Sequence, residues 1–318
     1  MKINRIQIQN FRSYQKREFE LEHRTLVVGP NGSGKSNLVE AIYLLAVGKS
    51  FRADADIEML RYRESFFRVT GKSEDEITVI MNEGRKKFEV NGVPRRMIDA
   101  MGRVRAVMFG PADMELVTGN PSGRRRYLDM VISQTDREYR RCAVSYEKGL
   151  RQRNRLLDLI RDGEAERNQL WFWDRLLIKD GEYITRKRQE FLDATGFFYD
   201  RSVISEIRLK QYEAEEVAAG STLVGPHRDD FVLKWEGKDV SKYGSRGEQR
   251  MTVWWLKQCE IKYLGGEPML LLDDIFSELD YKHREEVVEV VKNYEGQVVM
   301  TTAEKSLVPK DGWNIINL

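Results

Sequence analysis

The sequence predicts an α/β fold in which one head domain is interrupted by an inserted helical hairpin arm. Short β-like runs separated by turns fill the first hundred residues and return after residue 220, whereas residues 123–220 carry long helical periodicity and little Pro or Gly. A glycine-rich segment, 29–34, joins an apolar run to a helix-like stretch. We therefore expect residues 1–122 to form the N-terminal part of the head, 123–220 the arm, and 221–318 the C-terminal part of the head.

The first hundred residues show the alternation and the turn signals of antiparallel strands. Ile6 and Ile8 alternate with polar residues, and residues 77–80 form an apolar run. Residues 87–92 read Lys-Phe-Glu-Val-Asn-Gly, which is typical of a strand that enters an Asn-Gly hairpin turn. Residues 38–45 place apolar side chains on one face of a helix.

The middle of the chain has the pattern of a helical hairpin. Residues 124–162 are expected to form one long helix, followed by an Asp-Gly turn, and residues 170–197 to return antiparallel to it. The aromatic cluster at 171–173 lies on an amphipathic helix. This position favours packing between the two helices over a role in stacking nucleic-acid bases.

After residue 220, β-like runs alternate with helices, as in a parallel sheet covered by helices. In chain order we expect a strand at 231–235, a helix at 248–264, a buried strand at 269–272, a helix at 282–294 and a strand at 297–302.

The composition excludes several classes of protein. Of the 318 residues, 41% are hydrophobic and 33% are charged, and no apolar run approaches the roughly 20 residues that cross a bilayer. The first residues, MKINRIQIQNF, do not resemble an export signal, so we expect a cytoplasmic protein with no membrane partner. Cys142 and Cys259 lie far apart and without a nearby histidine, which predicts neither a disulfide framework nor a zinc site.

Positive charge is distributed unevenly, although the formal net charge is only +2. Residues 1–160 contain 30 Lys or Arg against 21 Asp or Glu, and residues 161–318 contain 23 against 30. The greatest excess, 18 basic against 9 acidic residues, lies in residues 84–161. Such asymmetry is typical of a face that binds a polyanion, and equally of a solvated helix surface that is rich in charge.

Residues 29–36 match the P-loop pattern Gly-x-x-x-x-Gly-Lys-Ser. Glycines let backbone N–H groups surround a phosphate, and the N-terminus of the following helix adds the positive end of its dipole. Lys35 would reach the β- and γ-phosphates, and the Ser36 hydroxyl would ligate Mg²⁺. The sequence thus predicts ATP and Mg²⁺ as cofactors, with the nucleotide bound by Gly29, Pro30, Asn31, Gly32, Ser33, Gly34, Lys35, Ser36 and Asn37.

A second half of the same site is expected at residues 269–274, Met-Leu-Leu-Leu-Asp-Asp. Four apolar residues predict a buried parallel strand, and the carboxyl ends of such strands are where ligands of open α/β sheets bind. Asp273 is expected to hold Mg²⁺ together with Ser36, and Asp274 to polarise the attacking water. The predicted catalytic residues are therefore Lys35, Asp273 and Asp274.

Two further strings complete the pattern of an ABC-type P-loop ATPase head. Residues 277–280, Ser-Glu-Leu-Asp, follow at the spacing of the D-loop, and residues 245–249, Ser-Arg-Gly-Glu-Gln, resemble the ABC signature. In that signature a serine hydroxyl, a glycine backbone and a helix N-terminus face a γ-phosphate. Within one head the signature lies far from the P-loop. Ser245 and Gly247 are therefore expected to bind nucleotide across an ATP-dependent homodimer.

Six strings spread along nearly the whole chain carry a resemblance to one family; they lie at residues 10–14, 34–42, 49–52, 123–129, 222–230 and 271–280. The most discriminating is Gly-Pro-His-Arg-Asp-Asp at 225–230. With these strings the chain resembles the RecF family of bacterial recombination mediators, whose heads are related to those of SMC proteins.

The resemblance implies a protein of DNA repair, replication, recombination and the SOS response. It implies ATP-dependent dimerisation, binding of gapped, single-stranded or duplex DNA, and weak DNA-dependent ATP hydrolysis that acts as a timer. It also implies that RecO and RecR are partners in loading RecA. By the same likeness Arg12 would lie near the phosphates, and Ser245 would reach the partner's γ-phosphate.

Several positions depart from the pattern of ABC transporters. Glu248 stands where the signature usually has glutamine, and Gly244 where it usually has leucine. Asp274 replaces a glutamate, and Thr302 occupies the position of the switch histidine. There is no convincing Q-loop glutamine. Because positioning dominates phosphoryl transfer, these changes are expected to weaken hydrolysis more than binding.

Two other functions remain open at this stage, the ATPase subunit of an ABC transporter and an SMC-like defence ATPase. The transporter predicts a coupling glutamine, a switch histidine and rapid turnover. The defence ATPase would need a nuclease on a separate protein, because only some 15 residues follow the last core strand.

The DNA-facing residues are less well defined. The candidates are Arg85, Lys86, Lys87, Arg95, Arg96, Arg103, Arg105, Arg124, Arg125, Arg126, Arg140, Arg141, Arg151, Arg153 and Arg155. For His227 we expect a hydrogen-bonded, structural role rather than a sensor of nucleotide. The sequence does not define the DNA structure that is preferred or the surface that would bind RecR.

Overall fold

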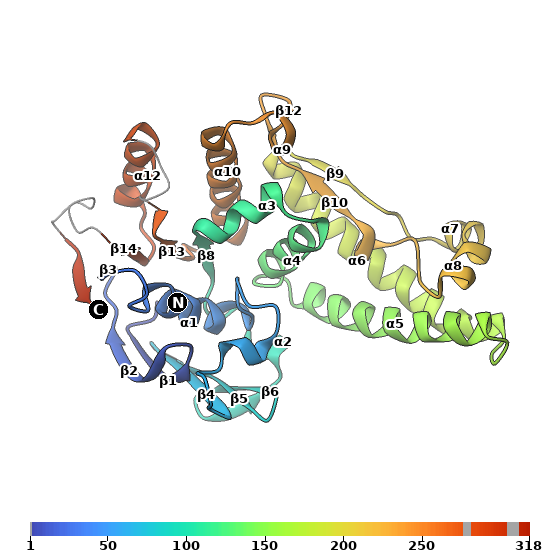
Figure 1. Ribbon diagram of the computed structural model, residues 1–318, viewed down its shortest axis with the longest axis horizontal. Helices are drawn as coiled ribbons and strands as arrows, with labels where there is room; N and C mark the ends of the chain where they lie inside the picture. Colours follow the sequence, from blue (N-terminus) through green and yellow to red (C-terminus); the bar gives the residue numbers. More distant parts are fainter. Residues whose placement is uncertain (1, 276–280, 304–311) are drawn as a thin grey trace. The chain divides into compact units, whose positions relative to one another are not determined.

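Figure 1 shows the computed structural model, which describes residues 2–275, 281–303 and 312–318. The chain forms two compact units. The head unit comprises Met1–Val117 and Gly244–Leu318, and the arm unit comprises Thr118–Tyr243. These limits describe compactness, and the division into domains at 122/123 and 220/221 stays a prediction.

The described part of the head unit contains an antiparallel and a parallel sheet. The antiparallel sheet has the strand order β2-β1-β4-β5-β6-β7, with β1 at Arg5–Phe11, β2 at Tyr14–Glu20, β4 at Phe66–Lys72, β5 at Glu76–Asn82, β6 at Arg85–Val90 and β7 at Val93–Arg95. The parallel sheet has the order β15-β3-β14-β13-β8, with β3 at Arg24–Val28, β8 at Ala106–Phe109, β13 at Met269–Asp273, β14 at Val298–Thr302 and β15 at Asn314–Asn317. All pairings in the second sheet are parallel, which agrees with the predicted α/β class.

Helix α1 (Lys35–Val47) lies between the two sheets and contacts strands of both (Figure 1). Nearly all of its residues are buried, as expected for a helix that is apolar on all sides. Glu40 differs from the apolar residues of this helix, because it carries a carboxylate and is nevertheless completely buried. This central helix fixes the position of the P-loop, which directly precedes it.

The remaining described helical segments of the head unit are η1 (Asp56–Met59), α2 (Met97–Ala100), η2 (Pro111–Met114), α3 (Glu115–Thr118, whose last residue already belongs to the arm unit), α10 (Arg246–Leu264) and α12 (Tyr281–Asn293). Helix α10 carries a buried ion cluster in which Lys257 Nζ lies 2.8 Å from Asp113 Oδ1 and 3.5 Å from Glu260 Oε2. Asp113 in turn accepts a hydrogen bond from the backbone N–H of Gly110, at the end of β8. The cluster thus connects α10 to the edge where the parallel strands end.

The arm unit is built around two long antiparallel helices, α5 (Arg137–Arg161) and α6 (Trp171–Thr195). Its other elements are α4 (Pro121–Ile132), η3 (Arg167–Leu170), β9 (Phe198–Asp200), α7 (Glu206–Gln211), α8 (Glu213–Ala219), η4 (Pro226–Arg228), β10 (Asp230–Val232), β11 (Lys234–Trp235), β12 (Lys238–Asp239) and α9 (Val240–Tyr243). The hairpin predicted from the sequence is therefore confirmed, with three differences in detail.

The first difference is that the predicted helix 124–162 is two helices, because Asp136 starts a new one. Its side chain accepts a hydrogen bond from the N–H of Tyr139, the arrangement of a helix N-cap. The second is that Trp171 and Phe172 are 63% and 56% exposed instead of packing between the helices. Both lie in the first turn of α6, and Leu170, at the end of η3, is buried instead. Trp173 is half-buried beside Gly149 of α5, so this member of the cluster does lie between the two helices.

The third difference concerns the strand predicted at 231–235. Strand β10 pairs antiparallel with β9, so this segment belongs to a small sheet of the arm unit. The sequence pattern alone predicts the head for this segment, because it does not show which strand β10 pairs with.

Candidate nucleotide site

The P-loop joins β3 to α1 with the backbone geometry that its glycines predict. Gly32 and Gly34 have φ values of 83° and 107°, a region that side chains rarely adopt. A Cβ atom at Gly34 would also lie 2.9 Å from the Tyr14 hydroxyl, which donates a hydrogen bond to the Gly34 carbonyl. Helix α1 starts without a side-chain cap and without an acidic residue in its first turn. Its first N–H groups and its dipole therefore form an anion site.

Lys35 bends back over this loop. Its ammonium donates hydrogen bonds to the carbonyl oxygens of Gly29 (2.7 Å) and Pro30 (3.0 Å), and its side chain is buried. Ser33, inside the loop, has a buried hydroxyl with no hydrogen-bond partner in the described residues. A buried and unpartnered hydroxyl is uncommon and fits a loop that is built to surround a polar ligand.

Ser36 and Asp273 meet directly although 237 residues separate them. The Ser36 hydroxyl donates a hydrogen bond of 3.0 Å to Asp273 Oδ1. The same oxygen accepts a second hydrogen bond, of 2.7 Å, from Thr301 Oγ1 at the end of β14. The two residues predicted to bind Mg²⁺ are therefore adjacent, and Thr301 orients the carboxylate.

Asp274 follows with an unusual backbone. Its φ is 46°, in the left-handed region that aspartate tolerates better than bulky residues but seldom adopts. The Asp274 N–H donates a hydrogen bond of 3.0 Å to Thr301 Oγ1, which holds this conformation. A single threonine hydroxyl thus fixes both acidic residues at the edge of the sheet. Strained backbone of this kind is concentrated at functional sites.

The residues at this edge fit a magnesium ion bound with a nucleotide. Mg²⁺ in such sites is usually held by one or two carboxylates or hydroxyls, by phosphates and by water, rather than by a cage of protein ligands. Asp273 and Ser36 supply that pair of oxygens. Within the described residues no group of three or more His, Cys, Asp or Glu side chains could hold a metal ion by itself. The donor set therefore suits an ion that arrives with phosphate.

Arg12 lies next to the start of α1 and is held by a carboxylate, that of Glu40, which was not among the residues predicted for the site. Its guanidinium donates to both oxygens of Glu40, at 2.9 and 2.7 Å, and to the carbonyl of Glu58. Arg52 and Ser50 also bind Glu40. Burial alone would raise the pKa of Glu40, but the hydrogen bonds from Arg12, Arg52 and Ser50 outweigh burial and lower it.

This cluster connects to the first turn of α1. The Asn37 side chain donates to Ser13 Oγ at 2.7 Å, and its amide oxygen accepts from Arg52. Arg12 also has a positive φ, 52°, in the turn between β1 and β2. Two arginines and an asparagine are thus fixed beside the P-loop by one buried carboxylate. A glutamate in an otherwise apolar helix was the signal that could have identified it.

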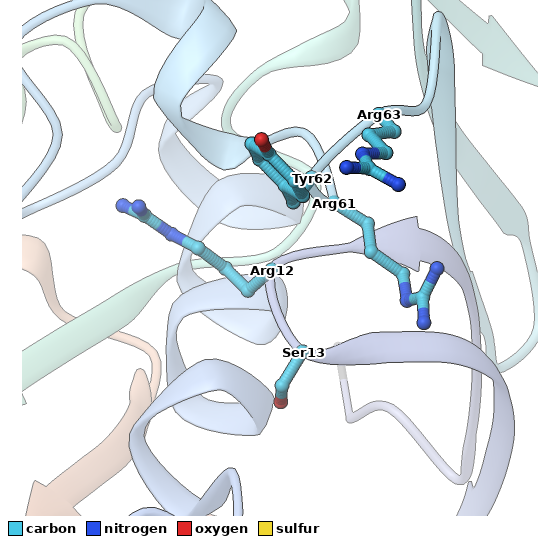
Figure 2. A pocket seen from close by; sticks show the side chains of 5 residues that line it. All are labelled: Arg12, Ser13, Arg61, Tyr62 and Arg63. Atoms are coloured by element: carbon cyan, nitrogen blue, oxygen red, sulfur yellow. The ribbon is translucent and has the colours of Figure 1, made fainter.

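Arg12 and Ser13 also line a shallow pocket of about 420 Å³ with Arg61, Tyr62 and Arg63 (Figure 2). Tyr62 is 82% exposed, and the guanidinium of Arg63 lies 5.2 Å from the centre of its ring. Arg61 and Arg63 point to one side of the loop and Arg12 to the other, as Figure 2 shows. A second hollow, lined by residues 13–17 with Gly32 and Ser33, lies beside the P-loop itself. The turn that contains Ser13 therefore separates two hollows.

Ser245 forms the N-cap of α10. Its hydroxyl accepts a hydrogen bond of 3.3 Å from the Glu248 N–H, and its own N–H donates to Glu248 Oε2 at 2.7 Å. This capping box explains why glutamate stands at a position where the signature usually has glutamine. Gly247 is open, since a Cβ atom there would meet only His283, at 3.8 Å. Ser245 is exposed, and both of these hydrogen bonds are made with a residue of its own helix.

Thr302 lies at the end of β14, opposite Val28 of β3, and is buried. Its carbonyl accepts a hydrogen bond of 3.4 Å from the N–H of Gly29, at the start of the P-loop. The predicted D-loop residues, Ser277-Glu278-Leu279-Asp280, lie outside the described residues.

In the arm unit, residues 225–230, Gly-Pro-His-Arg-Asp-Asp, form hydrogen bonds and ion pairs with several other segments of the unit. Asp229 is buried and binds Arg188 of α6 (3.0 Å) and the hydroxyl of Tyr199. His227 donates through Nε2 to the Thr222 carbonyl (3.0 Å), and its Nδ1 lies 2.8 Å from the Tyr146 hydroxyl, which donates to it when the imidazole is neutral. Burial lowers the pKa of His227 to about 4. These contacts support the structural role that we expected for this histidine.

Several of the candidate DNA-facing residues instead bind other parts of their own unit. Lys86 binds Asp56 and the Gly48 carbonyl, and Arg105 donates to the carbonyl of Leu264. The others with such contacts are Arg96 with Asp99, Arg103 with Asp75, Arg124 with Asp230, Arg125 with the Asp229 carbonyl, Arg140 with the Ser133 carbonyl, Arg141 with Glu138, Arg151 with Glu147, and Arg153 with Asp174 and Glu216. The sequence alone does not show which basic side chains bind residues of their own unit and which are free to bind DNA.

Comparisons with known proteins agree with this geometry. The family model described as RecF/RecN/SMC N terminal domain matches residues 2–314. The "DNA replication and repair protein RecF" of Moorella thermoacetica is 36% identical, over 97% of this chain and 92% of that protein. The protein of the same name from Herpetosiphon aurantiacus is 33% identical, over 96% and 94%. These relatives do not favour a transporter subunit or a defence ATPase.

Solved structures give the same result. The solved structure of the recombination mediator protein RecF-ATP in the RecFOR pathway is 30% identical, with a TM-score of 0.89 over 99% of this chain and 95% of that one. A second, with RecF-ATPrS, has a TM-score of 0.86, also at 30% identity, over 99% and 96%. An Smc head bound to ScpA, at 17% identity and a TM-score of 0.50, shares the fold.

Among the described residues, no helix has the length and apolar character needed to cross a membrane. The family model and the identities extend over nearly the whole chain, and so does the likeness to the structure with ATP. The chain belongs to the RecF/RecN/SMC family of ATP-binding, SMC-like ATPase heads and, within that family, to the RecF proteins.

Proposed function

We propose that this protein is an ATP-dependent DNA-binding protein of recombinational repair and replication restart, in which two heads close around ATP and hydrolysis times their release. The observation that carries the proposal is the hydrogen bond between Ser36 and Asp273, which brings the P-loop and the end of β13 to one point. The relatives, which are named as DNA replication and repair proteins, supply the DNA-repair context.

We propose that the P-loop and Lys35 bind the phosphates of ATP. Loop N–H groups and the start of α1 would hold the β-phosphate, and Lys35 would exchange its two carbonyl partners for phosphate oxygens. Magnesium bound by Ser36 and Asp273 would supply charge neutralisation of the β- and γ-phosphates. Thr301 keeps the Asp273 carboxylate directed toward Ser36.

Asp274 is the proposed group that orients the attacking water. Its side chain is one methylene shorter than the glutamate of transporters, and Thr302 cannot supply the cationic contact of a histidine. Both features support slow hydrolysis, since phosphoryl transfer depends on the positions of the attacking water and of the charges around the phosphate. We further propose that DNA increases the rate.

The dimer is proposed to use Ser245, Gly247 and the N-terminus of α10 on the partner's γ-phosphate. Ser245 is exposed at the start of a 19-residue helix whose dipole favours an anion there. Arg12, beside the P-loop, is proposed to act on the phosphates of its own head. The proposed partners are DNA, whether gapped, single-stranded or duplex, and the RecO and RecR proteins in loading RecA.

Two variants test the mechanism by their mass in solution. Lys35→Ala should not bind ATP and should stay monomeric, whereas Asp274→Asn should bind ATP and accumulate as a dimer because release is blocked. Size-exclusion chromatography with light scattering, with ATP and Mg²⁺ and without them, measures both. Lys292→Ala, which removes an exposed lysine near the end of α12, is the control and should behave as the wild type.

An Asp274→Asn protein that binds ATP but stays monomeric would contradict the dimer. DNA affinity measured with ATP, with ADP and without nucleotide tests the remaining part of the proposal. Equal affinity in all three states would remove the role of ATP as a timer of DNA binding.

A further inference from the structure

The antiparallel sheet of the head unit has a buried face and a solvent face. Ile8, Val69, Val79 and Phe88 lie opposite one another across β1, β4, β5 and β6, and all four are buried. Successive residues of a strand point to opposite faces of the sheet. The neighbouring cross-strand row must therefore lie on the opposite face of the sheet.

That neighbouring row is rich in cations. It runs through Lys16, Gln9, Arg68, Ile80 and Lys87, in the register of the paired strands. Three of these residues are basic and exposed, and they lie on β2, β4 and β6. Because strands lie about 4.8 Å apart, the three cations lie at intervals of about 10 Å and cover about 19 Å.

Arg85 adds a fourth exposed cation on the same face, two residues before Lys87. We call Lys16, Arg68, Arg85 and Lys87 the cation row. None of the four side chains makes an ion pair or a hydrogen bond within the described part of the chain. Glu89 is the next outward-facing residue of β6, and it too makes no ion pair there.

The other end of the same face is neutralised. Arg5 pairs with Glu18 and Glu20, and Lys72 pairs with Glu76 at 2.8 Å. Cations within one sheet face thus fall into two groups, one paired and one without carboxylate partners. Nothing in folding requires the second group to gather in one row, so an external anion is the natural partner.

The loop before β4 adds charge at the same end of the sheet. Its Arg61 N–H donates to the Asn10 carbonyl at 2.9 Å, and the Asn10 side chain donates to Glu64 at 3.1 Å, so the loop is fixed to the end of β1. Arg63, which Figure 2 shows pointing away from Arg12, lies in this fixed loop. Arg61 forms an ion pair with Glu64 at 3.5 Å, so the charge that this loop adds at the end of the sheet is that of Arg63.

The geometry points to DNA as the occupant. We propose that the cation row binds the phosphate backbone of DNA without reading its sequence, an inference that rests on the proposed DNA-binding function. About 19 Å of duplex carries about 11 phosphates, enough to meet every member of the row. A protein partner would need a cluster of aromatic or aliphatic anchors, and on this face of the sheet the apolar residues beside the cation row are Phe66 and Ile80, both half-buried.

The test compares two double variants that remove equal charge from the same face. Arg68→Gln with Lys87→Gln removes two members of the row, and Arg5→Gln with Lys72→Gln removes two paired cations. Lys16 is left unchanged because it also borders the hollow beside the P-loop. Fluorescence anisotropy of a labelled duplex with ATP, over a range of NaCl concentrations, gives the slope of log K against log salt. ATP binding should be the same in both variants.

Removing two phosphate contacts should reduce the slope by about 1.8, which is up to about sixty-fold in affinity at 0.1 M salt. The control variant should keep the slope of the wild type. Arg85→Gln, added to the first variant, should reduce the slope by about a further 0.9. Two labelled duplexes of unrelated sequence should respond equally.

Three results would overturn the proposal in distinguishable ways. Equal losses in the two double variants would show a general effect of charge. An unchanged slope in the Arg68→Gln, Lys87→Gln variant, while the wild type binds DNA, would show that DNA is bound elsewhere than at the cation row. A wild-type protein that does not bind DNA in any nucleotide state would overturn the proposed function together with the row.

Discussion

Glu40→Gln tests whether the buried carboxylate holds the cluster beside the P-loop. Glu40 is completely buried and accepts two hydrogen bonds from Arg12 and two from Arg52, whose side chains are only 21% and 32% exposed. The amide of glutamine has nearly the same shape as the carboxylate but carries no negative charge, and its NH2 group would face an arginine that is itself a donor. Breaking a buried ion pair costs about 3–5 kcal/mol, and partial access of water to both arginines reduces this to about 3 kcal/mol.

The assay is urea unfolding followed by circular dichroism. With an m-value of about 3 kcal/mol/M, the midpoint of the Glu40→Gln protein should fall by about 1 M. The control is Glu18→Gln, which breaks an exposed ion pair with Arg5 and should cost less than about 1 kcal/mol. If the two variants unfold at the same urea concentration, the carboxylate does not organise the cluster.

Proton linkage gives a second readout of the same carboxylate. Because the pKa of Glu40 in the folded protein lies below its usual value of 4.5, its stabilising contribution is complete above about pH 4.5. The contribution is lost as the pH falls through the lowered pKa. The difference in stability between wild type and Glu40→Gln should therefore be constant near neutral pH and shrink below pH 4.5.

Three further predictions concern other described residues. Thr301→Val removes the hydroxyl that donates to Asp273, so stability should fall by about 1–3 kcal/mol and ATP hydrolysis should slow, which urea unfolding and phosphate release measure. Burial lowers the pKa of His227 from 6.5 to about 4, so the wild type should lose up to about 3 kcal/mol as the pH falls from 6.5 to 4, and His227→Gln should lose this dependence in unfolding at several pH values. Glu248→Gln keeps the capping box but removes a negative charge roughly 6 Å from a partner's phosphate, worth about 0.7 kcal/mol at each of the two equivalent sites, so the ATP-dependent dimer should be about ten times tighter by light scattering. A weaker dimer would contradict the placement of the partner's phosphate near α10.

The P-loop and the acidic strand end could be predicted because each is a local pattern. Residues 29–36 specify their own turn and helix start, and residues 269–273 specify a buried strand whose carboxyl end bears an acid. The contact between Ser36 and Asp273 follows once both elements belong to one parallel sheet. Sequence alone could go this far because the fold fixes where such strand ends meet.

The supporting residues could not be predicted in the same way, because their roles depend on partners far away in the sequence. Glu40 binds Arg12, 28 residues before it, and Arg52, 12 residues after it. Thr301 looked like one more residue of an apolar strand, yet it binds both Asp273 and Asp274. The break between α4 and α5 was readable in principle, since Asp136 is a good N-cap. Helical periodicity continues across it and concealed it.

The capping box of Ser245 bears on how far the departures from the ABC signature matter. A serine hydroxyl has one proton to donate and two lone pairs that accept. In this protein one lone pair accepts from the Glu248 N–H, so the proton is still able to point toward a phosphate oxygen. The cap therefore fixes the position of Ser245 without consuming the donor that a partner's nucleotide would need. Glutamate in place of glutamine alters the charge near that phosphate, while the geometry of the serine is preserved.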